Sequence, residues 1–287
     1  MSEDNHENHD GDLGNLNLNP FKDMLDTVAN SIILPFQQVV TKVREAVIGG
    51  ALEQFQKTIQ AFGKALQALV DPDISDEEIQ RRISSYQAWG NYGWVVPPEA
   101  PFDLFNTAPS DLKTANRIAM QYCKPQDIES IFSELEQQKH VRKTDLQEAK
   151  FCFDNKKYKS CVMILFSMID ARLIRLSAKK GKEKQRPSGS EAANRLIDHI
   201  KQKYDKANYL FIVLRLAGLQ ACYDCIFARG NDFKMQVPTI NRNFIDHGMR
   251  WKRVTKTECI QVLLLYHETI TILDFLNVKK MTVTFKH

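Results

Sequence analysis

The sequence predicts an all-α protein, and three observations carry that prediction. Apolar residues recur three or four positions apart along most of the chain, which is the spacing of an amphipathic helix. A Ser or Thr stands three residues before a Glu at the head of three helical stretches, the pattern of a helix capping box. Clear alternation with period two is confined to the end of the chain (281–287), so we expect no β-sheet.

The composition is typical of a soluble globular protein, because 43% of the 287 residues are hydrophobic and 26% are charged. No apolar run approaches the roughly 20 residues that a membrane-spanning helix needs. The N-terminus is acidic and polar, unlike a secretory signal. Six scattered cysteines indicate buried thiols in a reducing compartment. We therefore expect a cytoplasmic protein that does not enter a membrane.

The first part of the chain is predicted to hold a tail and a helical region. Residues 1–20 are rich in Asn, Asp, His and Gly and lack periodicity, which predicts a disordered acidic tail. Within 21–109, two apolar stripes separated by Gly49-Gly50 predict a helical hairpin. Core packing is the ordinary explanation of such stripes. A partner-binding coiled coil and a membrane-surface helix are the alternatives, and glutamines on the polar face disfavour the second.

A helix is expected to begin at the capping box of Ser75 and Glu78 and to end near Trp89. The stretch 90–109 contains four prolines and several aromatic residues. It is predicted to be a packed irregular loop at the boundary between the N-terminal region and a helical bundle over 110–287.

Capping boxes and helix breakers define the elements of this bundle. The expected elements are short helices at 111–122 and 126–139, two helices that meet at 155–157, an exposed basic loop at 179–190, a helix from the Ser188–Glu191 capping box to about Tyr204, an apolar helix over about 208–228, and a long final helix over 256–277 capped by Thr255 and Glu258.

Charge is distributed unevenly between the two halves. Residues 1–144 contain 13 Lys and Arg against 21 Asp and Glu, whereas residues 145–287 contain 26 against 14. A basic second half is what a polyanionic partner would bind, although a solvated lysine-rich surface is the simpler explanation.

One short segment of the basic half, Pro238–Gly248, groups residues that can do chemistry. Asn241 as N-cap and Gly248 as C′ residue predict a short helix that starts at Arg242 and has His247 in its last turn. Asn243 and His247 are four apart and share a face. Arg242 and His247 are five apart, about 140° around an ideal helix. Either the helix is distorted, or a second copy of the protein completes the site.

The string Arg242-Asn243-x-x-x-His247 resembles the R-x(4–6)-H motif of the HEPN superfamily (higher eukaryotes and prokaryotes nucleotide-binding domains). The polar residue after the arginine, the basic helical context and the position before the last long helix are similar too. The likeness covers about residues 144–277 and is to members found in bacterial defence and toxin systems. It implies a helical bundle of HEPN type over 110–287 and a homodimeric, metal-independent endoribonuclease without a cofactor. RNA is the implied substrate, and an antitoxin or another regulatory partner is possible.

The resemblance assigns a role to each residue of the motif. His247 would transfer protons, since imidazole titrates near neutral pH. Arg242 would stabilise the charge of the transition state, and Asn243 would orient the phosphate or the histidine. Arg250, Lys252 and Arg253 would hold the RNA backbone, and Trp251 would stack on a base.

Simpler explanations exist for the same residues. Arg242 can form an ion pair with Asp246 on a solvated helix face, and His247 can act as a cation at a helix C-terminus. The chain would then be a non-catalytic helical module that binds protein or RNA with a degenerate HEPN fold. A third hypothesis is a component of a larger assembly, docked through the N-terminal hairpin.

Other candidate residues are weaker. Asp170 lies in an apolar helical run, so it is expected either to pair with Arg172, Arg175 or another helix, or to reach the active site as an accessory acid. Cys222 and Cys225 have redox-motif spacing but lack the βαβ context, which favours two buried thiols. No set of residues has the spacing of a metal site, and we expect none.

Overall fold

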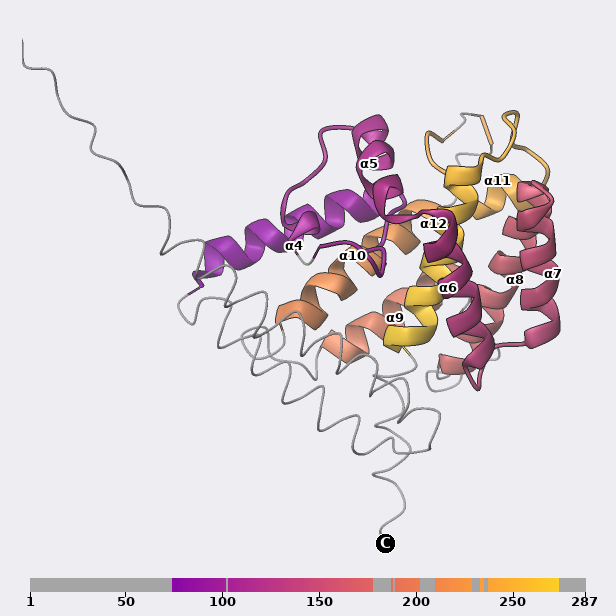
Figure 1. Cartoon of the computed structure of the whole chain (residues 1–287). Coiled ribbons are helices and arrows are strands. Elements are labelled where there is room, and N and C mark those ends of the chain that lie inside the picture. The colour runs from indigo at the N-terminus through magenta and orange to yellow at the C-terminus, as the bar shows by residue number, and fades with distance from the viewer. Residues whose placement is uncertain are drawn as a thin grey trace, which may run out of the picture. The chain divides into compact units, whose positions relative to one another are not determined.

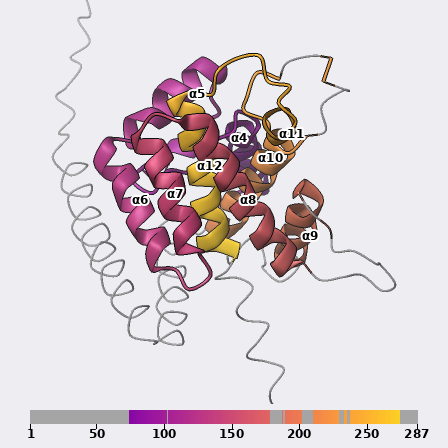
Figure 2. The same ribbon diagram turned by 90° about the vertical axis from the view of Figure 1, so that its right-hand side faces the viewer.

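The computed structural model describes residues 74–101, 103–177, 187, 189–201, 210–228, 233–234 and 237–273. These residues are all-helical and contain no strand, which confirms the predicted class for this part of the chain (Figures 1 and 2). The predicted acidic tail, the N-terminal hairpin, Ser188 and most of the loop at 179–190 lie outside the described residues.

The described elements follow the predicted order closely. They are α4 (Asp76–Asn91), the 3₁₀ turn η2 (Leu104–Asn106), α5 (Leu112–Ala119), the 3₁₀ turn η3 (Met120–Tyr122), α6 (Pro125–Gln137), α7 (Lys143–Asp154), α8 (Tyr158–Leu176), α9 (Gly189–Lys201), α10 (Leu210–Ile226), α11 (Arg242–Asp246), α12 (Lys256–Glu268) and the π-helical turn η4 (Thr269–Leu273).

Local capping signals fix several helix starts where they were predicted. The Ser75 hydroxyl accepts from the backbone N–H of Glu78 at 3.2 Å, which starts α4. The Glu78 carboxylate turns instead to Arg81 and Arg82, and these hydrogen bonds lower its pKa to about 2. At α12 the capping box is complete, because Thr255 and Glu258 bond to each other's backbone N–H groups.

Helix α12 is the centre of the bundle. It packs against α8 and α6, and α7 packs against both of those helices (Figures 1 and 2). Every residue from Cys259 to Glu268 is buried. Regular α geometry ends at Glu268, and the chain stays helical as a π-helical turn to Leu273, whereas the last residues of the predicted helix, 274–277, lie outside the described part of the chain. There Thr269 and Thr271 donate hydroxyl hydrogen bonds to carbonyls four residues earlier, which competes with regular helix geometry.

The aromatic loop after α4 is packed, as predicted, but it does not separate two cores. Trp89 and Trp94 are almost fully buried, and Trp89 stacks on Phe105 with 4.3 Å between ring centroids. These side chains belong to the same continuous core as the apolar residues of α8 and α12. The boundary expected at 109/110 is therefore not a boundary of the core, because α4 lies along α10, a helix of the second half.

Helices α4 and α10 approach each other at two glycines. A Cβ atom on Gly90 would lie 2.3 Å from the carbonyl oxygen of Gly218 and 2.8 Å from the backbone nitrogen of Cys222. These are backbone atoms, so they cannot rotate away. Glycine at position 90 is what permits this close crossing.

We predict that Gly90→Ala lowers the free energy of unfolding by about 3 kcal/mol, because the added methyl group overpacks a backbone contact. Gly218→Ala is the matched control, since a Cβ there would meet its nearest atom, the carbonyl oxygen of Tyr86, at 3.2 Å. Urea unfolding of both variants measures the difference. A loss for Gly90→Ala no greater than for Gly218→Ala would contradict the close crossing.

Candidate functional site

Helix α11 is a single turn whose start is held by the buried Asn241. The Asn241 side-chain oxygen accepts from the backbone N–H groups of Asn243 and Phe244, at 3.0 and 3.4 Å. Its amide donates to the carbonyls of Cys225 and Ala228, at the end of α10. Asn241 is thus the predicted N-cap, and it also satisfies carbonyls that the end of α10 leaves unpaired.

Arg242 is held between two carboxylates and an aromatic ring. Its Nη2 lies 2.5 Å from Oδ2 of Asp170 on α8, and its Nε lies 3.2 Å from Oδ2 of Asp246. The guanidinium carbon lies 5.7 Å from the ring centroid of the buried Phe227. The Asp246 contact is the ordinary pair expected on a helix face, and Asp170 reaches the motif from another helix. About a third of the Arg242 side chain, 31%, remains exposed.

The Asp170 side chain is largely shielded from solvent at this site, with 14% of its surface exposed. Burial raises the pKa of its carboxyl above the ordinary value, and the charge of Asp246 adds to that effect. The Arg242 guanidinium and the backbone N–H of Gly189, at the start of α9, act in the opposite direction. Two carboxylates around one guanidinium leave this cluster with an excess negative charge when both are ionised.

The other two motif residues point elsewhere. The Asn243 amide donates to the carbonyl of Ala228 at 2.9 Å, so in this structure it holds the end of α10. His247 is the C-cap of α11 and is exposed, with its ring edge-on to Phe233 at 5.5 Å between centroids. Gly248 follows with φ +68°, the left-handed C′ residue that was predicted. Within one chain, no side-chain contact between Arg242 and His247 is recorded among the described residues, consistent with their five-residue separation.

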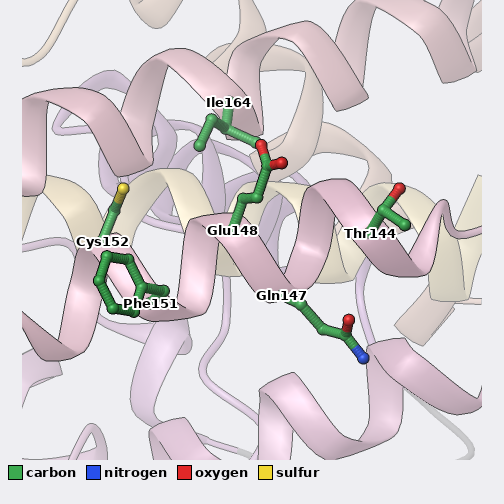
Figure 3. Close-up of a pocket in the computed structure, with 6 residues that line it drawn as sticks. All are labelled: Thr144, Gln147, Glu148, Phe151, Cys152 and Ile164. Atoms are coloured by element: carbon green, nitrogen blue, oxygen red, sulfur yellow. The ribbon is translucent and has the colours of Figure 1, made fainter.

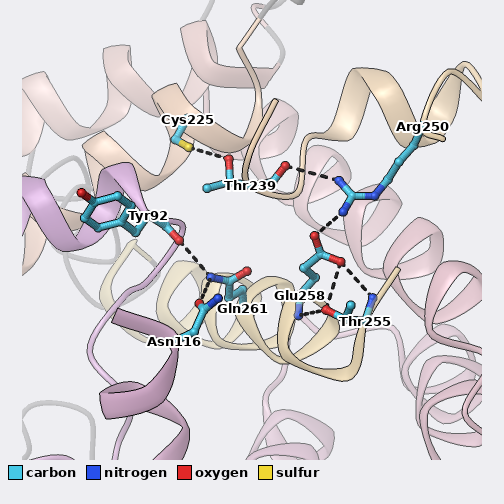
Figure 4. A network of polar contacts seen from close by, with 8 residues as sticks. All are labelled: Tyr92, Asn116, Cys225, Thr239, Arg250, Thr255, Glu258 and Gln261. Carbon is cyan, nitrogen blue, oxygen red and sulfur yellow. Dashed lines mark hydrogen bonds and ion pairs between the residues drawn. The ribbon is translucent and has the colours of Figure 1, made fainter. Parts of the chain in front are cut away.

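The predicted RNA-contacting residues after α11 fall into two groups. Trp251 is 79% exposed, and Lys252 and Arg253 are exposed beside it. The Arg250 side chain is only 8% exposed, forms an ion pair with Glu258, and donates to the carbonyl of Thr239 at 3.3 Å (Figure 4). Arg250 therefore joins the α10–α11 connection to the start of α12, and we do not retain it as an RNA contact.

The polar network around Arg250 extends along α12. Gln261 donates to the carbonyl of Tyr92, and Cys225 makes a 3.1 Å thiol–hydroxyl contact with Thr239 (Figure 4). Cys222 is fully buried, and burial raises the pKa of both Cys222 and Cys225. Raised thiol pKa values disfavour nucleophilic thiolates. The predicted burial holds for Cys222, whereas Cys225 is partly buried.

A pocket of about 570 Å³ lies on α7 and α8 rather than at the motif. Five of its six lining residues come from α7, and Ile164 comes from α8 (Figure 3). No predicted site residue lines it. Within the described residues, no group of three or more His, Cys, Asp or Glu side chains is placed to hold a metal ion.

No helix in the described part of the chain is long and apolar enough to cross a membrane. The chain matches no protein-family model, and no curated protein or solved structure was found to be similar to it.

Proposed function

We propose that the protein is a metal-independent endoribonuclease of HEPN type, with its active site around Arg242, Asn243 and His247. The observation that supports it best is the position of Arg242. Asp170 of α8 holds the guanidinium at the start of α11, and an exposed imidazole follows the same short helix. A fixed guanidinium and an accessible imidazole are the groups needed for cleavage next to a ribose 2′-hydroxyl.

In the proposed reaction, the RNA 2′-oxygen attacks the adjacent phosphorus while its proton passes to an imidazole. The bond from phosphorus to the 5′-oxygen breaks, and that oxygen receives a proton. The products carry a 2′,3′-cyclic phosphate and a 5′-hydroxyl. Arg242 would stabilise the charge on the pentavalent phosphorus with its planar set of donors. Proton transfer and charge stabilisation by these groups require no metal ion.

The site is proposed to need two copies of the protein. Arg242 is directed towards α8, whereas His247 is directed towards Phe233. A homodimer that brings two α11 helices together would place the arginine of one copy near the histidine of the other. Trp251, Lys252 and Arg253 would then hold the RNA next to that site. The resemblance extends this proposal to a defence or toxin effector with an antitoxin or other regulatory partner.

The test is an RNA cleavage assay in EDTA with the full chain, comparing wild type with Arg242→Ala and His247→Ala. We expect only the wild type to cut and its products to end in 2′,3′-cyclic phosphate. His140→Ala is the matched control, because His140 is exposed on the turn after α6, outside α11. Cleavage by His247→Ala at the wild-type rate would refute the proposal.

One observation favours a second candidate, a non-catalytic RNA-binding module. Arg242 already has two carboxylate partners and Asn243 already donates to Ala228, so both side chains have structural roles. This candidate predicts that folded wild-type protein binds RNA without producing any cleavage products.

A further inference from the structure

A basic turn joins α7 to α8 on a part of the surface that the motif does not include. Lys156, Lys157 and Lys159 are all exposed there, and no ion pair with a described residue is recorded for any of them. The nearest acid in sequence, Asp154, is paired with Lys150 at 2.9 Å. The turn and the first residues of α8 therefore present three positive charges for which the described part of the chain supplies no ion pair.

The backbone conformation of this turn disfavours a lysine at position 156. Lys156 has φ +59°, in the left-handed region where glycine or asparagine is normally found after a helix. Its amide donates to the carbonyl of Phe153, and that of Lys157 donates to the carbonyl of Cys152, which closes α7. Folding alone would favour glycine at position 156, so a charged side chain there calls for another explanation.

An exposed aromatic ring stands next to the lysines. Phe151 is 60% exposed, and the Lys157 ammonium lies 5.8 Å from the centroid of its ring. The same ring lines the 570 Å³ pocket on α7, along with Cys152 and Glu148 (Figure 3). The pocket is an open hollow rather than an enclosed cavity, and it leaves room for a nucleobase to lie against the Phe151 ring. A cation beside an exposed aromatic ring is the combination that binds single-stranded nucleic acid.

The turn also lies close to the basic residues that follow the motif. The Lys256 ammonium, at the start of α12, lies 6.0 Å from the ring centroid of Phe153 on α7. Lys252 and Arg253 precede Lys256 by four and three residues, and all three are exposed. The α7–α8 turn and the start of α12 therefore lie side by side and carry charge of the same sign.

We propose that the α7–α8 turn is a second RNA-binding surface, distinct from the motif residues of α11. Lys156, Lys157 and Lys159 bind phosphates, and Phe151 stacks on an unpaired base. The choice of RNA as the partner rests on the proposed function, but the turn binds RNA whether or not the motif cleaves it. Glu148 lines the pocket and repels the backbone, so phosphates lie over the turn and only a base enters the pocket.

The test measures binding of a fluorescent, mixed-sequence single-stranded RNA to the full chain carrying His247→Ala, which excludes cleavage from the readout. In that background the turn variant is Lys156→Gly with Lys157→Gln and Lys159→Gln. Its control, with the same loss of charge, is Lys113→Gln with Lys139→Gln and Lys143→Gln, three exposed lysines outside the turn, on α5, after α6 and at the opposite end of α7. Single Phe151→Leu and Glu148→Gln variants complete the set.

We expect the turn variant to bind at least about tenfold more weakly at 0.1 M salt. The slope of log affinity against log salt should fall by about 2, since each lost contact to single-stranded RNA removes about 0.7. Phe151→Leu should weaken binding, and Glu148→Gln should strengthen it. The turn variant should melt no lower than its parent, because glycine relieves the strained backbone at position 156.

The outcomes separate this proposal from the proposed function. Equal binding by the turn and control variants would overturn the second surface and leave the ribonuclease proposal intact. Binding that depends on the turn, in a wild-type protein that never cleaves RNA, would support the surface and count against the nuclease. Absence of RNA binding by the folded parent would overturn the second surface.

Discussion

Replacing Arg215 with alanine is expected to lower the free energy of unfolding by about 3–5 kcal/mol, because it leaves a buried carboxylate without its partner. The Arg215 Nε donates to Glu268 Oε1 at 2.8 Å, and its Nη2 donates to the other oxygen. The Glu268 side chain is 2% exposed, against 22% for Arg215. Water can therefore reach the arginine but not the glutamate. Urea unfolding followed by circular dichroism measures the loss.

The unequal exposure of this pair supplies the control. Glu268→Gln leaves an arginine that water can still partly hydrate, so it should cost less than Arg215→Ala. Replacing both residues with methionine should restore most of the stability, because it removes the buried charge as well as its partner. Equal losses for the two single variants would mean that the burial of Glu268 does not govern the energetics of the pair.

Features that depend on a few neighbouring residues could be predicted from the sequence. Ser75, Asn241 and Thr255 were recognised as caps because a capping side chain bonds to a backbone N–H only two or three residues ahead. The turn at 155–157 was likewise visible as a polar break between two helical stretches. Local signals of this kind require no knowledge of the tertiary structure.

Features that depend on distant residues could not be predicted in the same way. The π-helical turn after Glu268 involves Thr269, whose hydroxyl contacts that of Tyr223, 46 residues away. The crossing at Gly90 depends on the backbone at Gly218 and Cys222, in a helix of the other half. For this reason the sequence suggested a domain boundary at 109/110, where the structure has one continuous core.

In the candidate site, too, local features could be predicted from the sequence and contacts between distant residues could not. A partner for Asp170 on another helix was one of several possibilities, and the chain alone did not identify Arg242. The basic run that contains Arg250 predicts an exposed RNA contact. In the structure the Arg250 side chain is largely buried, because it pairs with Glu258 and donates to the carbonyl of Thr239. The sequence of the lysines after Asn155 predicts a helix break and does not by itself predict a binding surface. Their charge in so short a turn was the available signal for a binding surface.

His247→Ala and Arg242→Ala should each reduce RNA cleavage by about 100-fold or more if the proposed function is right, because each would then remove a group that acts in the transition state. The more informative measurement mixes the two inactive variants under conditions in which subunits exchange. If each site takes its arginine from one copy and its histidine from the other, a mixed dimer retains one intact site of two.

Random exchange makes about half of the dimers mixed, so the mixture should recover about a quarter of the wild-type activity. If both residues of a site came from the same copy, no intact site could form and the mixture would stay as inactive as its components. Exchange itself is checked with tagged wild-type protein. Recovery would explain why Arg242 is directed to α8 and His247 to Phe233 in one chain. Their five-residue spacing, unsuitable for a site within one helix, is suitable for a site shared by two.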